Sequence, residues 1–158
     1  MTPLSPLQLK QHFFVRFSIL PNPGGTIQGA QILEPTISFD KSPQAPNQWA
    51  LGLRITLKSA KPEAPTLYEA DIEMFGIVEV HNDFPPEKSE QLAVVNGLGL
   101  LYSAIREMFL NVTARSANGA LSLPILNFVG VLPSRTQADA PAPTPGQPQE
   151  AAPNPAPK

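Results

Sequence analysis

The sequence contains no cysteine and only two histidines, His12 and His81, among its 158 residues. Without cysteine the chain forms no disulfide, thiolate nucleophile or cysteine-ligated zinc site. Two histidines are too few for a histidine-rich metal centre. Charge is also scarce, with 11 Lys and Arg against 13 Asp and Glu, a net charge of -2. A nearly neutral chain lacks the basic surface that nucleic acids and anionic membranes attract, so neither partner is expected.

Long apolar runs are missing as well. The first residues (MTPLSPLQLKQHFF) lack a basic stretch followed by an apolar one, so we expect no secretory leader. Two stretches carry no charge, 91–105 and 116–134. The first is too short to span a bilayer, and the second is interrupted by glycine, proline and asparagine. We therefore expect no membrane insertion and a cytoplasmic location.

Proline, in contrast, is abundant, and its distribution divides the chain. Residues 133–158 hold eight of the 20 prolines and six alanines, but no aromatic or larger aliphatic residue. Such a segment has nothing large to bury and cannot offset the entropy of ordering. The sequence predicts one folded domain at 8–132 and a disordered Pro/Ala-rich tail at 133–158, which we interpret as a spacer.

Four segments show the alternation of half-buried antiparallel strands: 12–20, 36–40, 48–59 and 66–80. The third is the clearest, with a large apolar residue at every second position. In the first, the same period places four residues on one face: Phe13, Val15, Phe17 and Ile19. In the fourth, the apolar face opposes Glu69, Asp71 and Glu73, which must face water because burial of unpaired charge is costly.

A helical region follows. Prolines 85 and 86 suit a first turn, and a short helix is predicted over 87–95, interrupted at Gly97 and Gly99. A longer helix is predicted over 98–117, with Asn118-Gly119 as a left-handed cap.

The longer helix carries more apolar surface than a sheet can cover. One stripe fits the packing on the sheet, and Leu100, Ala104 and Leu110 begin a second. A second stripe requires a second cover, and another copy of the chain is the simplest one. We therefore expect a homo-oligomer.

No catalytic constellation is found. Gly97-x-Gly99 lacks the third glycine and the preceding strand of a dinucleotide fingerprint. The three carboxylates of 66–80 have no histidine or further ligand nearby in the pattern. The sequence thus predicts neither an enzyme nor a bound cofactor or metal.

Residues 95–128 carry a series of motifs. It begins with Asn96, Leu100, Leu101 and Tyr102, continues with the Arg106-Glu107 pair and Arg115, and ends with Pro124, Asn127 and Phe128. In these motifs the segment resembles the SecB family of protein-export chaperones. Upstream, Phe-Gly-Ile-Val-Glu-Val at 75–80 resembles the family's strand before the main helix. The resemblance extends in order over about residues 10–132.

This resemblance implies an α+β fold: a four-stranded antiparallel sheet packed against a long helix, assembled as a homotetramer (a dimer of dimers). It also implies an ATP-independent chaperone, a holdase that binds unfolded polypeptides for protein transport and translocation, with SecA as a candidate partner. The groove positions that match the family are Leu33, Ile37, Phe39, Ile77 and Phe128, although each also suits a core residue. The resemblance also implies that Glu69, Asp71 and Glu73 dock a SecA-type partner. Leu101, Tyr102 and Ile105 are expected to form the oligomer interface or the core.

One departure from the family keeps the biological role open. The family's second long helix follows the Asn-Phe pair, but here it can extend only over 125–132 before Pro133 ends it. Dedicated export therefore stands beside the role of a SecB-like chaperone in a toxin–antitoxin system. A hypothesis of another class is a non-chaperone oligomeric adaptor that docks one folded partner through the acidic sheet face.

Overall fold

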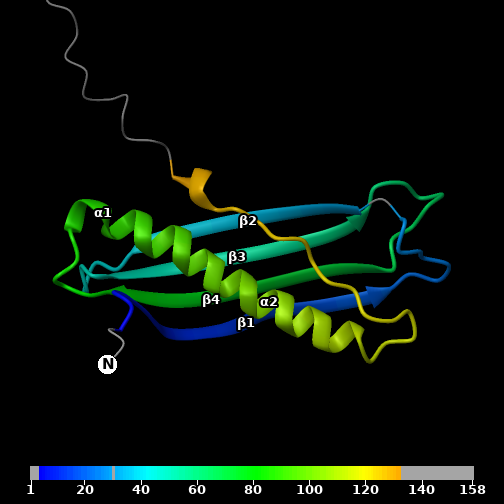
Figure 1. Cartoon of the computed structure of the whole chain (residues 1–158), viewed down its shortest axis with the longest axis horizontal. Helices are drawn as coiled ribbons and strands as arrows, with labels where there is room; N and C mark the ends of the chain where they lie inside the picture. The colour runs from blue at the N-terminus through cyan, green and yellow to red at the C-terminus, as the bar shows by residue number, and fades with distance from the viewer. Residues whose placement is uncertain (1–3, 30, 133–158) are drawn as a thin grey trace, which may run out of the picture.

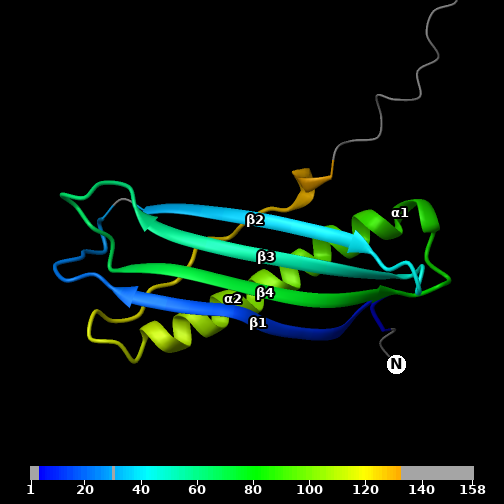
Figure 2. The ribbon, with the colours of Figure 1, turned by 180° about the vertical axis from the view of Figure 1, so that it is seen from behind.

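The computed structural model describes residues 4–29 and 31–132, and the predicted tail lies outside the described residues. Its four strands form one antiparallel sheet in the order β1-β4-β3-β2. They are β1 (Leu7–Pro21), β2 (Gln31–Lys41), β3 (Gln48–Ser59) and β4 (Tyr68–Val80). A long helix crosses one face obliquely (Figure 1), and the other face carries no helix (Figure 2). The predicted α+β architecture is confirmed.

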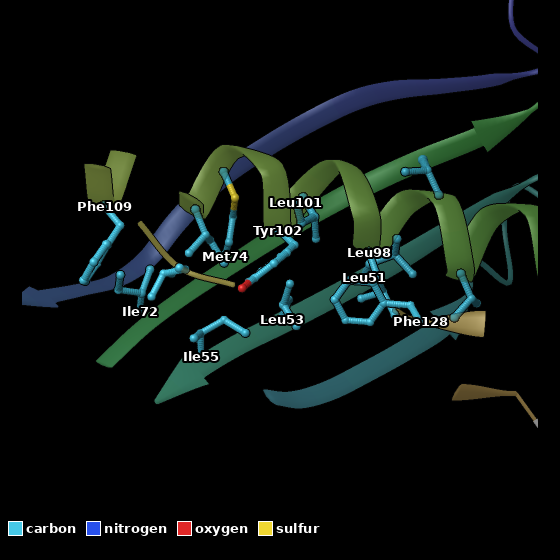
Figure 3. Close-up of a cluster of buried hydrophobic side chains, with 14 of the residues drawn as sticks. Leu51, Leu53, Ile55, Ile72, Met74, Leu98, Leu101, Tyr102, Phe109 and Phe128 are labelled. Atoms are coloured by element: carbon cyan, nitrogen blue, oxygen red, sulfur yellow. The ribbon is translucent and has the colours of Figure 1, made fainter. Parts of the chain in front are cut away.

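The core lies between the two central strands and the helix. Every second residue of β3 and β4 is buried, and the pairing sets Leu53 opposite Met74 and Ile55 opposite Ile72. The helix contributes Leu98, Leu101, Ile105 and Phe109 to the same cluster (Figure 3). The alternation predicted for 48–59 and 66–80 is thus confirmed. One face of these strands is buried under the helix, and the other is partly exposed.

Strand β1 departs from the predicted alternation. Its pairing with β4 shifts register twice, leaving Lys10 and Val15 as extra residues in β-bulges. Each extra residue reverses which face of the sheet the preceding side chains of β1 point to. Phe14 therefore packs against the core, whereas Phe13 lies on the opposite face and stacks on Phe75, with ring centroids 5.4 Å apart. The prediction that Phe13 and Val15 share a face with Phe17 and Ile19 is wrong.

The helical region is continuous. It consists of α1 (Pro86–Gln91), one π-helical turn η1 (Leu92–Asn96) and α2 (Gly97–Thr113). This 28-residue helix is long and apolar enough to cross a membrane by length and composition, but a core helix meets the same criteria. Here its apolar stripe packs on the sheet. The helix ends at Thr113 rather than at 117, and Gly119, with φ of +81°, closes the following turn.

The predicted interruption at Gly97 and Gly99 is wrong, for two different reasons. Gly97 lies close against the sheet: a Cβ there would clash with Cδ1 of Leu51 and lie 3.2 Å from Cγ1 of Val78. Close packing therefore offsets its poor helix propensity. Gly99 has nothing within 4 Å of such a Cβ and is simply tolerated.

This contrast gives a matched pair of variants. Gly97→Ala is expected to destabilise the fold by about 1–3 kcal/mol, since the buried Leu51 must be displaced. Gly99→Ala is expected to stabilise it by up to about 1 kcal/mol through helix propensity. Urea unfolding followed by far-UV circular dichroism measures both. Equal effects of the two substitutions would contradict the close approach at Gly97.

Candidate functional site: apolar surfaces and a charged sheet face

The predicted groove residues divide between the two sheet faces. Leu33, Ile37 and Phe39 lie on β2, half-buried against the core on the helix side. Ile77 lies between the core-facing Gly76 and Val78, so its side chain belongs to the opposite face. The prediction that Ile77 shares one groove with the β2 residues is corrected here. The run Phe75-Gly76-Ile77-Val78 is apolar on both faces, so the sequence pattern alone does not assign it.

Phe128 is buried, at 5% exposure, by its place in a returning segment. After α2, residues 119–128, here named the strap, run back over the helix side of the sheet (Figure 1). Within the strap the backbone is extended, and the predicted helix over 125–132 is reduced to the 3-10 turn η2 (Val129–Val131). The Phe128 ring meets Tyr102 edge to face, with centroids 5.9 Å apart.

Side chains of β4 and α2 hold the strap. The Tyr68 hydroxyl donates to the carbonyl oxygen of Gly119 at 2.6 Å, and the Tyr102 hydroxyl donates to that of Pro124 at 2.5 Å. Between them, Arg106 Nε donates to the Leu123 carbonyl oxygen at 3.0 Å. Burial raises the pKa of Tyr102, which keeps its hydroxyl protonated as a donor. Nothing in the local sequence pattern of α2 predicts this network.

A second apolar surface stays open beside α2. We name it the flank surface: Phe14, Phe17, Met74, Ala104 and Met108. Apart from Phe17, these residues line a shallow depression of about 330 Å³ where the helix passes over β1, with the buried Met74 beneath it. The rest of its lining is His12, Phe13, Glu107 and Asn111. Phe14 and Phe17 contact edge to face at 5.3 Å, which extends the surface along the outer strand. An apolar area beside an open strand edge is typical of an interaction surface.

The residues predicted for the oligomer interface lie inside the single chain. Leu101 and Tyr102 are buried on the sheet side of α2 (Figure 3), and Ile105 belongs to the same buried core, which fits the core alternative. The apolar residues that α2 presents to solvent are Leu100, Met108 and Leu110, each more than 40% exposed. Of the predicted second stripe, Leu100 and Leu110 are therefore exposed, whereas Ala104 is half-buried against the core.

The helix-free face carries a charge network centred on Asp71. Arg54 binds both carboxylate oxygens, with Nε and Nη2 each at 2.7 Å, and Arg16 adds a third contact at 2.9 Å. The hydrogen bonds from Arg54, then those from Arg16, lower the pKa of Asp71 from its ordinary 3.8 to about 2. Asp71 is thus paired rather than free to dock a basic partner.

The pairing predicts an acid-dependent loss of stability. Because the folded-state pKa of Asp71 is depressed, its contribution is present above about pH 4 and is lost as the pH falls towards 2. Asp71→Asn should therefore lower the melting temperature at neutral pH, and the difference from the unsubstituted protein should close near pH 2. Glu69→Gln on the same strand is the control. A pH-independent difference for Asp71→Asn would argue against the ion pair as its cause.

The rest of this face mixes both signs. Lys10 lies 3.5 Å from Glu79, whose pKa is lowered chiefly by a hydrogen bond from Gln48. Lys58 lies 3.9 Å from Glu34 at the β2 edge. Glu69 and Glu73 complete the carboxylates predicted for partner docking, and Arg54 lies within electrostatic reach of Glu73. Among residues 4–29 and 31–132, no cluster of three or more metal-ligating side chains is found.

No family model and no curated protein matches the chain. Among solved structures, the fold is that of a SecB-like chaperone. One such structure is Rv1957 of Mycobacterium tuberculosis, a SecB-like chaperone solved in complex with a ChAD peptide from the Rv1956 HigA1 antitoxin. It is 22% identical with a TM-score of 0.59, over 77% of this chain and 91% of that one. A protein of unknown function from Streptococcus agalactiae is 13% identical, with a TM-score of 0.48 over 75% of this chain and 97% of its own. The resemblance noted in the sequence is confirmed for the fold.

Proposed function

We propose that this protein is an ATP-independent chaperone that binds unfolded polypeptides, without catalysis and without a cofactor. The carrying observation is apolar surface on the helix side of a SecB-like fold, formed by Phe14 and Phe17 of the flank surface and by the half-buried residues of β2. Exposed apolar surface binds the apolar segments that an unfolded chain presents. Several such surfaces in one assembly turn weak contacts into tight capture.

We further propose that the assembly is a homo-oligomer, a tetramer by analogy with SecB, located in the cytoplasm. Leu100 and Met108 lie on the solvent side of α2, and Ala104 lies between them in sequence. A second α2 packed against this side would supply the cover that the second stripe requires. Client binding then falls to the groove beside β2, where Leu33, Ile37 and Phe39 lie.

Two roles fit this activity. The relative Rv1957 was solved with an antitoxin peptide, which favours an antitoxin or similar disordered segment as a client. Export with a SecA-type partner is the alternative, and Glu69 and Glu73 would then dock it, because Asp71 is occupied by Arg54 and Arg16. Mixed charge across this face weakens the export role relative to the antitoxin role.

The test is an aggregation assay combined with a mass measurement. The purified protein is added at a series of ratios to a chemically unfolded, slow-folding polypeptide without nucleotide, and turbidity is followed on dilution. Light scattering on a sizing column reports the mass alone and with the client. We expect a multiple of the 17.0 kDa chain mass, suppressed turbidity and a complex that contains client. An oligomer that leaves turbidity unchanged would support the folded-partner adaptor instead.

A further inference from the structure

The strap is held in the way a bound peptide is held. Its partners from β4 and α2 reach main-chain atoms: the carbonyl oxygens of Gly119, Leu123 and Pro124 accept from Tyr68, Arg106 and Tyr102. The Leu121 amide donates to the Thr113 hydroxyl at 3.1 Å. Contacts to main-chain atoms do not depend on which side chains the bound segment carries.

Four strap side chains fill apolar positions, separated in turn by two, three and two residues: Leu121, Leu123, Leu126 and Phe128. Leu123 and Phe128 are buried, and Leu121 and Leu126 pack against the same core as the β2 groove residues. Ile125 points outwards and is 84% exposed. Within the described residues, no backbone hydrogen bond joins 120–127 to a strand, so the strap is not a fifth strand of the sheet.

We infer that the surface beneath the strap is a binding site for an extended apolar polypeptide segment, which enters by displacing the strap. The fitting occupant carries large apolar residues at the strap's own spacings of two, three and two, and its main chain satisfies the four polar partners. This inference rests on the proposed function and adds to it a site and a mode of entry. Phe128 then competes with the client rather than contacting it.

Because the strap and an external peptide compete for one surface, the direction in which a strap substitution changes peptide affinity can be predicted. An attached strap is present at high effective concentration, so only the fraction of molecules with an open strap binds an external segment. Apparent affinity is reduced by that fraction. A substitution that weakens the strap, but leaves the surface beneath it intact, should therefore tighten the binding of an external peptide.

The probe is a fluorescent synthetic peptide with the strap sequence GALSLPILNFV, residues 119–129, titrated into the full chain. Leu123→Ala removes a buried anchor of the strap and should tighten peptide binding at least about tenfold, measured by fluorescence anisotropy. Ile125→Ala alters an exposed position of the strap and should leave the affinity unchanged. A peptide in which Leu123 and Phe128 are both replaced by aspartate should not bind.

Weaker binding by Leu123→Ala, or no binding of the peptide to either protein, would overturn the inference. Should Leu123→Ala fail to fold, the half-buried Leu126→Ala gives a smaller tightening, and its absence counts equally against displacement. The same experiments distinguish a failure of this inference from a failure of the proposed chaperone function. An active holdase whose peptide affinity ignores both substitutions refutes displacement alone. Tightened peptide binding in a protein that never suppresses aggregation refutes the chaperone and keeps the site.

Discussion

Replacing Phe109 with alanine should destabilise the protein by about 3–5 kcal/mol. The side chain is fully buried between α2 and the sheet, where it meets Tyr68 edge to face at 6.2 Å. The Tyr68 hydroxyl also holds the strap at Gly119, so a cavity at Phe109 loosens both layers above the sheet. Urea unfolding followed by far-UV circular dichroism gives the free energy of unfolding directly.

The control for Phe109 is its neighbour on the helix. Leu110→Ala removes a side chain that is 42% exposed, and its cost should not exceed about 1 kcal/mol. A comparable loss for both variants would mean that α2 does not sit on the sheet with Phe109 inwards.

Introducing carboxylates on the solvent side of α2 should dissociate the proposed assembly. Leu100→Glu combined with Met108→Glu would place two charges per copy in the contact, and burial of unpaired charge is prohibitive. Light scattering should then give the single-chain mass of 17.0 kDa in place of a multiple. Both positions are exposed in the single chain, so the fold itself should survive.

Ile27→Glu tests the specificity of this result, because Ile27 is a similarly exposed apolar residue in the loop after β1. It should leave the mass unchanged. Dissociation by Ile27→Glu, or an undiminished mass for the double variant, would place the contact between copies elsewhere than on α2.

The sequence is most informative for strands in which all side chains on one face are buried and those on the other face are not. On β3 and β4 the alternation fixed the strands and their buried faces. On β1 the consecutive Phe13 and Phe14 fit either face, and only pairing with β4 reveals the bulges at Lys10 and Val15. Strand β2 runs over Gln31–Lys41, well beyond the predicted 36–40, because an edge strand with one half-buried face needs few apolar residues.

The candidate site is harder to predict, because its key contacts join segments that are far apart in the sequence. The irregular sequence around Phe128 predicts an open groove position. Irregular backbone is nevertheless compatible with burial when side chains hydrogen-bond to it, as Tyr102 and Arg106 do here. The spacing of Leu121, Leu123, Leu126 and Phe128 is a signal that could have identified the strap. The ion pairs of Asp71 join three strands, and no local pattern contains them.

The π-helical turn has a consequence for the rotational phase of the helix. From Ser89 to Thr113, every fourth residue is buried. In an ideal α-helix each four-residue step advances about 40° around the axis, so a long series of such steps would turn away from the sheet. The wider turn at Leu92–Asn96 takes up part of this drift, and the oblique crossing over the sheet accommodates the rest (Figure 1). A π-turn holds one residue more than an α-turn for nearly the same rotation, so deletion of one residue at Leu92–Asn96 would let the turn close as an ordinary α-turn with α1 and α2 still in phase. The same deletion within α2 would rotate α1 by about 100° relative to the remainder of α2.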